Sequence, residues 1–342
     1  MVHKKSLITS FLIGLLVFAM TGCVQSEPLL SESEAQKMAT VPSAWVVYWD
    51  LQDGSKDAKQ ISDKLDGLVL FAANFTPDGT LVCSKDLLAL RGKIKKGKYT
   101  SFLSVVNDVT NGDETVALKD PKIVAKLLQD EAATQKHITE LINLTKKAGL
   151  GGLEIDYENI WKNKEAITYF PNFVSKLYTS AQAAGLKLRI VLEPSAPFKE
   201  LKLVKGPEYV VMFYNLYGLH SGPGPKANRQ FIYNTLSAMS SLPEPKAAAL
   251  SNGGCIWSSK AKPQFITEKE AVRLQKKYNV TPTRDINSQC LVYRYREGTT
   301  VYDVWYADKA TINQWITWVK QGGIARISLW RLGGIADVKG IK

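Results

Sequence analysis

Short apolar runs recur along the chain and alternate with longer segments of helical periodicity. Early runs that are almost continuously apolar occupy residues 44–50, 67–74 and 99–107. Such runs are typical of parallel strands that are buried on both faces. Further along, Ile138, Leu141 and Ile142 mark one face of a predicted helix, which ends at Gly149. The pattern therefore predicts alternating strands and helices, as in an α/β protein.

This alternation predicts eight strands. They are centred on Trp45, Leu68, Phe102, Leu153, Ile190, Val211, Ala248 and Ile327. Eight strand–helix units favour an α/β fold of the (β/α)8 TIM-barrel type over an open doubly wound sheet. No glycine-rich nucleotide loop follows the first strand, which also disfavours the open sheet. The long interval between the last two strands predicts a small α+β insertion after strand 7, at about residues 256–306.

The amino-terminal segment has the pattern of an export signal. Lys4 and Lys5 precede an apolar run over residues 7–20, which is short for a membrane span. The sequence Met20-Thr21-Gly22-Cys23 resembles a bacterial lipobox, so residues 1–22 are predicted to be a lipoprotein signal peptide and Cys23 the lipidated residue. A plain signal peptide and an uncleaved anchor are the alternatives. Residues 23–41 then form a predicted flexible tether, and residues 42–342 the barrel.

These features predict an exported protein that a lipid anchor holds on the outer side of the bacterial cell membrane. The chain has 44 Lys and Arg against 32 Asp and Glu, a net charge of +12. An exported basic protein is attracted to anionic lipids and wall polymers. Nucleic acid is not an expected partner, because apart from residues 91–98 the basic residues are dispersed. A monomer is expected.

The cysteines do not predict a structural framework. Beyond Cys23 the chain contains Cys83, Cys255 and Cys290, an odd number without CxxC spacing, which excludes a disulfide framework and a zinc site. Pairing of Cys255 with Cys290 stays open. His137 is expected on a solvated helix face, too isolated to suggest a metal, and neither a metal nor another cofactor is expected.

The fourth predicted strand carries three acids in alternation with apolar residues. Side chains alternate between the faces of a strand, so Glu154, Asp156 and Glu158 share one face, about 6–7 Å apart. Their mutual repulsion raises the pKa of at least one of them. A carboxyl group that stays protonated near neutral pH can act as a general acid. The alternative is a polar layer inside the barrel, neutralised by Arg or Lys.

The acidic strand resembles the signature of glycoside hydrolase family 18, the chitinases and related endo-N-acetylglucosaminidases. That signature reads Asp-Gly-x-Asp-x-Asp-x-Glu. Here Gly151 and Glu154 replace its first two acids, whereas Asp156 and Glu158 are intact. The resemblance implies a TIM barrel whose active site lies at the carboxyl ends of the strands.

Two further motifs resemble the same family. The sequence Met212-Phe213-Tyr214-Asn215 is similar to its Met-x-Tyr-Asp motif, with Asn215 in place of Asp. Trp330 ends the eighth strand, where the family has a Trp at the floor of the sugar subsite. Residues expected to bind substrate around the strand ends are Tyr48, Trp49, Asn74, Asn107, Glu154, Glu193, Met212, Asn215 and Trp330.

The resemblance implies a retaining, substrate-assisted glycosidase mechanism. Glu158 would protonate the glycosidic oxygen, Asp156 would orient the substrate's acetamido group, and Tyr214 would hold it. The implied substrate is a β-1,4-linked polysaccharide that contains N-acetylglucosamine, such as peptidoglycan or chitin. A lectin-like protein that binds such glycans without cleaving them is one alternative. A structural lipoprotein that uses the barrel only as a scaffold is another.

Overall fold

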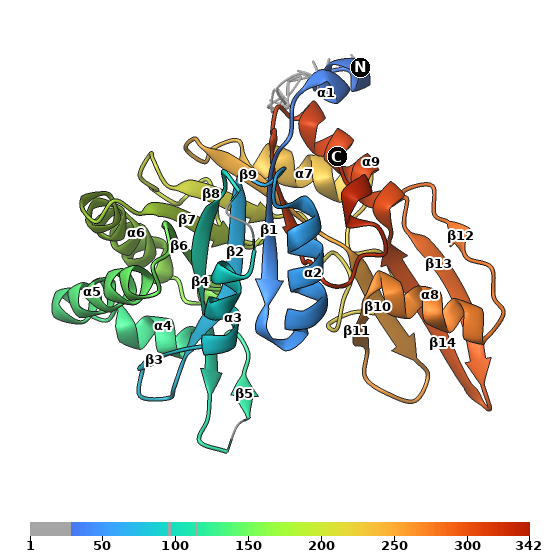
Figure 1. Ribbon diagram of the computed structural model, residues 1–342, viewed down its shortest axis with the longest axis horizontal. Helices are drawn as coiled ribbons and strands as arrows, with labels where there is room; N and C mark the ends of the chain where they lie inside the picture. The colour runs from blue at the N-terminus through green and yellow to red at the C-terminus, as the bar shows by residue number, and fades with distance from the viewer. Residues whose placement is uncertain (1–28, 95–96, 114) are drawn as a thin grey trace, which may run out of the picture.

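Eight parallel strands form a closed barrel in the computed structural model, which describes residues 29–342 except 95–96 and 114 (Figure 1). The barrel strands are β1 (Val41–Val47), β2 (Gly67–Phe75), β4 (Thr100–Thr110), β6 (Gly152–Asp156), β7 (Lys187–Leu192), β8 (Glu208–Met212), β9 (Lys246–Ser251) and β15 (Arg326–Trp330). β1 pairs with both β2 and β15, and β2 also pairs with β4, which closes the ring. The predicted (β/α)8 TIM barrel and its eight strands are confirmed.

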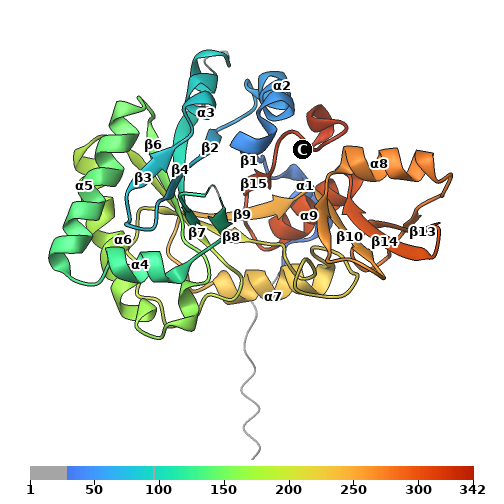
Figure 2. The same ribbon diagram turned by 90° about the horizontal axis from the view of Figure 1, so that it is seen from below.

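Helices surround the barrel and cover the outer faces of its strands (Figures 1 and 2). They are α2 (Leu51–Ile61), α3 (Lys85–Ala89), α4 (Pro121–Leu127), α5 (Glu131–Lys147), α6 (Ala166–Ala183), α7 (Arg229–Met239) and α9 (Lys309–Gln321). In β6, Leu153 and Ile155 belong to the apolar layer between strands and helices. Glu154 and Asp156 therefore point into the barrel, as the alternation of a strand requires.

A second sheet follows β9 after one intervening residue. Its strands are β10 (Gly253–Ser258), β11 (Gln264–Ile266), β12 (Thr283–Arg284), β13 (Leu291–Glu297) and β14 (Thr300–Ala307), with helix α8 (Glu268–Lys277). The sheet is antiparallel, has a core of its own and stands beside the barrel (Figures 1 and 2). A Cβ at Gly254 would lie 1.8 Å from the Trp305 carbonyl oxygen, so only glycine fits there. This sheet occupies the region of the predicted insertion.

The predicted tether is wrong for residues 29–41, because these residues are ordered. Helix α1 (Glu32–Lys37) has a capping box at Ser31. The Leu30 amide donates a 2.7 Å hydrogen bond to the Gln321 carbonyl, and Lys320 Nζ donates another of 2.7 Å to the Met38 carbonyl. α1 thus packs on α9 at the amino-terminal end of the barrel, and β1 already begins at Val41. A short polar helix becomes stable here through contacts that sequence periodicity cannot show.

The predicted signal peptide and the lipidated Cys23 lie outside the described residues. Within the described part of the chain, no helix has both the length and the apolar character needed to cross a bilayer.

The packing corrects one minor prediction, for His137, and answers the open question about Cys255 and Cys290. His137 is buried, not solvated: its ring stacks on Phe173, and its Nε2 lies 2.8 Å from the Tyr157 hydroxyl. Burial lowers the pKa of His137 to about 4. Cys255 and Cys290 are both buried free thiols and do not pair with each other. Cys255 lies on β10, whereas Cys290 precedes β13, two strands away in the second sheet.

Candidate active site

The carboxyl ends of the barrel strands bring the predicted site residues to one end of the molecule, which Figure 2 shows end-on. Tyr48 and Trp49 follow β1, Asn74 lies in β2 and Asn107 in β4, Asp156 ends β6 and Glu158 follows it, Glu193 follows β7, Met212 ends β8 and Tyr214 and Asn215 follow it, and Trp330 ends β15. These residues span almost the whole sequence. The closed sheet alone makes them neighbours.

Glu154 lies at the base of the site and is fully buried, so it does not reach the open end. Trp45 Nε1 donates a 2.7 Å hydrogen bond to Glu154 Oε1, and Arg189 Nε lies 2.9 Å from Glu154 Oε2 as an ion pair. Arg189 also donates to the hydroxyls of Ser43 and Ser328, at 2.9 Å each. Burial raises the pKa of Glu154, while Arg189 and Trp45 oppose the rise. The neutralised polar layer considered from sequence therefore does exist, at this lowest acid.

Asp156 occupies the next level of the same face. It is buried, and its Oδ1 has no hydrogen-bond partner among the described residues. Burial first, and then the charge of Glu158, raise the pKa of Asp156 well above its usual range, although Lys119 opposes this. The Tyr214 side chain is also buried, and burial together with the charge of Asp156 raises the pKa of its phenol. A buried hydrogen-bond acceptor without a donor costs free energy. Such an unpaired atom is expected where the donor comes from a bound ligand.

Glu158 lies at the rim, where its side chain forms an ion pair with Lys119. Burial raises the pKa of Glu158, and the ammonium group of Lys119 partly offsets the rise. Asn107 holds the backbone at this point. Its Oδ1 accepts a 2.9 Å hydrogen bond from the Glu158 amide, and its Nδ2 donates one of 2.9 Å to the Glu158 carbonyl.

Asn107 was expected to contact substrate, and this is corrected. It is completely buried, and the oxygen and nitrogen of its side-chain amide both bond to the backbone of Glu158. From its place in β4, Asn107 bridges to the neighbouring strand β6, an arrangement that only the pairing of the two strands creates.

Aromatic rings line another side of the opening. The Trp330 ring lies 5.1 Å from Phe71 and 5.8 Å from Trp45, in edge-on contacts that fix its orientation. Trp49 and Tyr48 are 51% and 46% exposed, unusual values for such large rings. Their exposed surfaces offer stacking faces to a ligand.

The remaining predicted residues have mixed surroundings. Asn74 Nδ2 donates a 2.7 Å hydrogen bond to the Thr110 hydroxyl, and Glu193 Oε2 accepts one of 2.7 Å from the Asn159 amide. Met212 is buried in the barrel core. Asn215 has a left-handed φ of 71°, a conformation that Asn tolerates better than most residues.

Sequence reasoning missed four polar residues at this end of the barrel: Lys119, Asp108, Lys226 and Arg331. Burial lowers the pKa of Lys226 to about 8, and the charges of Arg331 and Lys119 contribute to the shift. Arg331 pairs with Asp50 and covers the Trp49 ring at 5.8 Å. Arg331 directly follows Trp330 and Asp108 directly follows Asn107, so their positions next to predicted site residues could have identified them from the sequence. Lys119 and Lys226 lie in loops away from any motif, and no sequence pattern identifies them as site residues.

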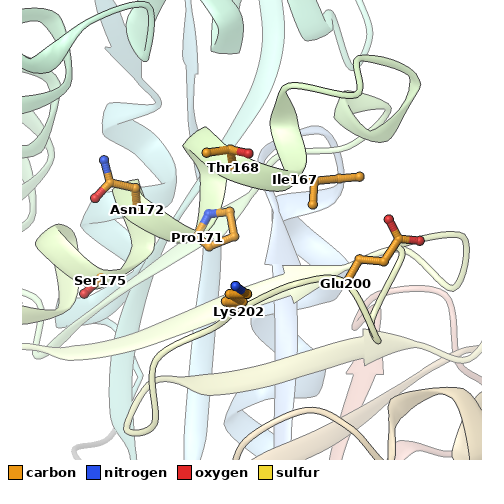
Figure 3. A pocket seen from close by; sticks show the side chains of 7 residues that line it. All are labelled: Ile167, Thr168, Pro171, Asn172, Ser175, Glu200 and Lys202. Carbon is orange, nitrogen blue, oxygen red and sulfur yellow. The ribbon is translucent and has the colours of Figure 1, made fainter.

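A separate hollow of about 390 Å³ lies on the outer side of the barrel (Figure 3). It lies between α6 and the segment after β7, and its lining residues are Ile167, Thr168, Pro171, Asn172, Ser175, Glu200 and Lys202. None of the acids of β6 lines it, so it is distinct from the candidate active site. Over the described ranges, no group of His, Cys, Asp and Glu is arranged to hold a metal ion.

No protein-family model matches the chain. By sequence, it is 25% identical over 297 residues to a cortical fragment-lytic enzyme of Bacillus cereus, a match that covers 80% of this chain and 66% of that protein. The chain thus spans just under two thirds of the length of that relative. It is also 24% identical over 247 residues to an uncharacterized glycosylase of Bacillus subtilis, with coverage of 67% and 71%.

Solved structures show the same fold. The Bacillus cereus spore cortex-lytic enzyme SleL aligns with a TM-score of 0.74 at 19% identity, over 87% of this chain and 72% of SleL. A chitinase from Chromobacterium violaceum aligns with a TM-score of 0.74 at 17% identity, over 88% of this chain and 97% of the chitinase. A class V chitinase from tobacco aligns with a TM-score of 0.67 at 14% identity, over 86% and 94%.

Fold and site together define a chitinase-like (β/α)8 barrel. The solved structures share the fold that the resemblance to glycoside hydrolase family 18 implies, and two of them are named as chitinases. The sequence relatives are named as a lytic enzyme and a glycosylase.

Proposed function

We propose that this protein is a retaining glycosidase that cleaves β-1,4-linked glycans containing N-acetylglucosamine, with peptidoglycan as its substrate. The observation that carries the proposal is the pair of buried carboxyl groups of Asp156 and Glu158, two residues apart at the carboxyl end of β6. Burial raises the pKa of both. Groups of this kind can hold and transfer a proton near neutral pH.

The placement of the two acids favours substrate assistance. In the two-carboxylate mechanisms the acids face each other across the scissile bond, about 5–9.5 Å apart. Asp156 and Glu158 instead project from the same strand end, which favours a nucleophile supplied by the substrate. Its acetamido oxygen attacks the anomeric carbon while Glu158 gives its proton to the glycosidic oxygen. The unpartnered Asp156 Oδ1 accepts the acetamido N–H, and the Tyr214 hydroxyl holds the acetamido oxygen.

We expect Asp156→Asn and Tyr214→Phe each to lower kcat at least about tenfold, which is roughly 1.4 kcal/mol of transition-state stabilisation. Both groups act on the acetamido group as it becomes the nucleophile. Steady-state kinetics on chito-oligomers measures the effect. Tyr209→Phe is the matched control, because the Tyr209 hydroxyl bonds to the Val204 carbonyl, outside the site. Unchanged kcat in both site variants would refute substrate assistance.

Location also supports a wall substrate. With Cys23 lipidated, five residues lie between the anchor and Leu29, so six residue-to-residue steps give a reach of roughly 20 Å when fully extended. Residues 29–40 lie at the amino-terminal end of the barrel, opposite the β4–β5 hairpin at the carboxyl end (Figure 1). An anchored molecule would therefore direct its site away from the membrane and towards the wall. The cortical fragment-lytic relative is consistent with such a substrate.

Digestion of purified wall tests the substrate. We expect new reducing ends that are N-acetylglucosamine, the sugar that we assign to the non-reducing side of the broken bond and whose acetamido group would assist. Chito-oligomers should be poorer substrates. Borohydride reduction of the digest followed by mass spectrometry identifies the ends. An inert wall with rapid chitin turnover contradicts the proposal, and glycan binding without any turnover selects the lectin-like alternative.

A further inference from the structure

Lys119 creates a conflict at the proposed acid. A general acid has to carry a proton when substrate is bound, yet the ion pair with Lys119 stabilises the charged form of Glu158. Burial alone would lower the pKa of Lys119, but the charges of Glu158 and Asp156 outweigh it and raise that pKa. Lys119 therefore stays cationic beside Glu158. If another anion binds the Lys119 ammonium group in place of Glu158, the charged form of Glu158 loses its stabilisation. Glu158 can then carry the proton that catalysis requires.

The position of Lys119 is built by the fold. Strand β5 (Val116–Ala117) pairs with the end of β4, and the chain then turns back at Lys119 with a left-handed φ of 54°. The Lys119 amide donates a 2.8 Å hydrogen bond to Asp108 Oδ1. The next residue, Asp120, exchanges hydrogen bonds of 2.9 and 3.1 Å with Asn107, the residue that also holds Glu158. Asn107 thus holds the backbone next to Lys119 as well as the backbone of Glu158.

Lys119 is also accessible to a ligand. Its side chain is 38% exposed, whereas that of Glu158 is 10% exposed. An incoming anion can therefore bind the ammonium group from the open side without displacing the backbone. Arg331 and Lys226 lie at the same end of the barrel, but Arg331 is paired with Asp50 and Lys226 is buried. The carboxyl groups of Asp108 and Glu193 lie near Glu158 as well, so the attraction for an anion is centred on Lys119 itself.

Wall glycan carries a carboxylate next to the oxygen of the bond to be cleaved. In a glycan of alternating N-acetylglucosamine and N-acetylmuramic acid, the scissile oxygen is O4 of the muramic residue. The adjacent O3 carries a lactyl group that ends in a carboxylate. Glu158 has to approach O4 in order to protonate it, and Lys119 contacts Glu158. The lactyl carboxylate is therefore the substrate anion that comes nearest to Lys119.

We propose that Lys119 is a specificity-determining residue that binds the free lactyl carboxylate of muramic acid on the leaving-group side of the cleaved bond. This inference rests on the proposed function. The carboxylate replaces Glu158 as the partner of Lys119, and Glu158 then holds the proton that it passes to O4. The muramic residue departs with a 4-hydroxyl group, and Lys119 remains protonated throughout.

A preference for the free carboxylate also implies an order of reactions during wall degradation. In intact wall the lactyl carboxyl group is joined to a stem peptide through an amide bond, so it carries no negative charge. The preferred substrate is therefore a glycan strand from which the stem peptides have been released. Prior action of an amide-cleaving hydrolase should therefore raise the rate at which this protein cleaves the wall.

The test compares three probes with the full-length protein. They are peptide-free strands of alternating N-acetylglucosamine and N-acetylmuramic acid, the same strands with the lactyl carboxylate converted to a methylamide, and chitotetraose. For the unmodified protein we expect kcat/KM to be at least about tenfold higher on the free acid than on the methylamide. Equal rates on these two probes would overturn the inference without any variant. If none of the three is cleaved, the proposed function itself fails, which is a different outcome.

Variants of Lys119 give the second readout. We expect Lys119→Met to abolish the preference for the free acid over the methylamide, whereas Lys119→Arg keeps most of it. Lys122→Met is the matched control, because Lys122 is an exposed lysine on the neighbouring helix α4. A Lys119→Met variant that loses activity equally on all three probes would show that Lys119 only positions Glu158. That result would also overturn the inference.

Discussion

Glu158→Gln is expected to lower hydrolysis by roughly 10²–10⁴-fold while oligosaccharide binding is retained, since general acid catalysis contributes about this much. Glutamine keeps the shape of the side chain but has no proton to give to a glycosidic oxygen. The backbone of residue 158 is held by Asn107 and not by its own carboxyl group, so the strand end should keep its geometry. Turnover of a chromogenic N-acetylglucosamine oligomer and calorimetric binding of the uncleaved oligomer are the two measurements.

The control for this variant is Glu200→Gln, an exposed carboxylate beside the outer hollow. It makes the same chemical change far from the barrel opening and should leave kcat unaltered. Undiminished turnover in Glu158→Gln would remove this residue from the mechanism. Loss of both turnover and binding would point to collapse of the strand end, which the thermal midpoint of the variant would reveal.

Arg189→Met is expected to lower the free energy of unfolding by about 3–5 kcal/mol, the usual cost of removing one partner of a buried ion pair. The substitution removes the cationic partner of the fully buried carboxylate of Glu154 and leaves it with neutral donors such as Trp45 Nε1. It also removes the hydrogen bonds to Ser43 and Ser328, which lie on β1 and β15. Urea unfolding followed by tryptophan fluorescence measures the change.

The double variant Glu154→Gln with Arg189→Met separates charge from packing. It removes both charges together, so it should recover a substantial part of the loss seen in Arg189→Met alone. If the double variant is as unstable as the single one, the cost comes from lost packing and hydroxyl contacts. A single variant with unchanged stability would show that the ion pair below the site contributes nothing measurable.

The barrel could be predicted from sequence because its signals are local. Buried parallel strands require apolar runs of strand length, and such runs are visible in the sequence at β1, β2 and β4. The alternation in β6 likewise assigns Glu154, Asp156 and Glu158 to one face whatever surrounds them. Their shared orientation into the barrel interior follows from two-residue periodicity alone, once Leu153 and Ile155 are assigned to the outer layer.

The environment of each acid depended on the tertiary structure. Arg189 neutralises Glu154 because β6 and β7 are adjacent, and Lys119 reaches Glu158 because a hairpin at the end of β4 turns back over β6. Asn107 proved to hold the backbone of Glu158, although its position in the sequence equally suited a substrate contact.

The sequence by itself thus determined the barrel and the face that carries the acids, because apolar runs and strand alternation are properties of neighbouring residues. It could not determine which groups meet across strands, and two expectations were wrong for this reason. His137 became buried by packing on Phe173, and the segment before Val41 folded into a helix by packing on α9. Charge partners, burial and pKa depend on residues distant in sequence, and closure of the barrel is what brings them together.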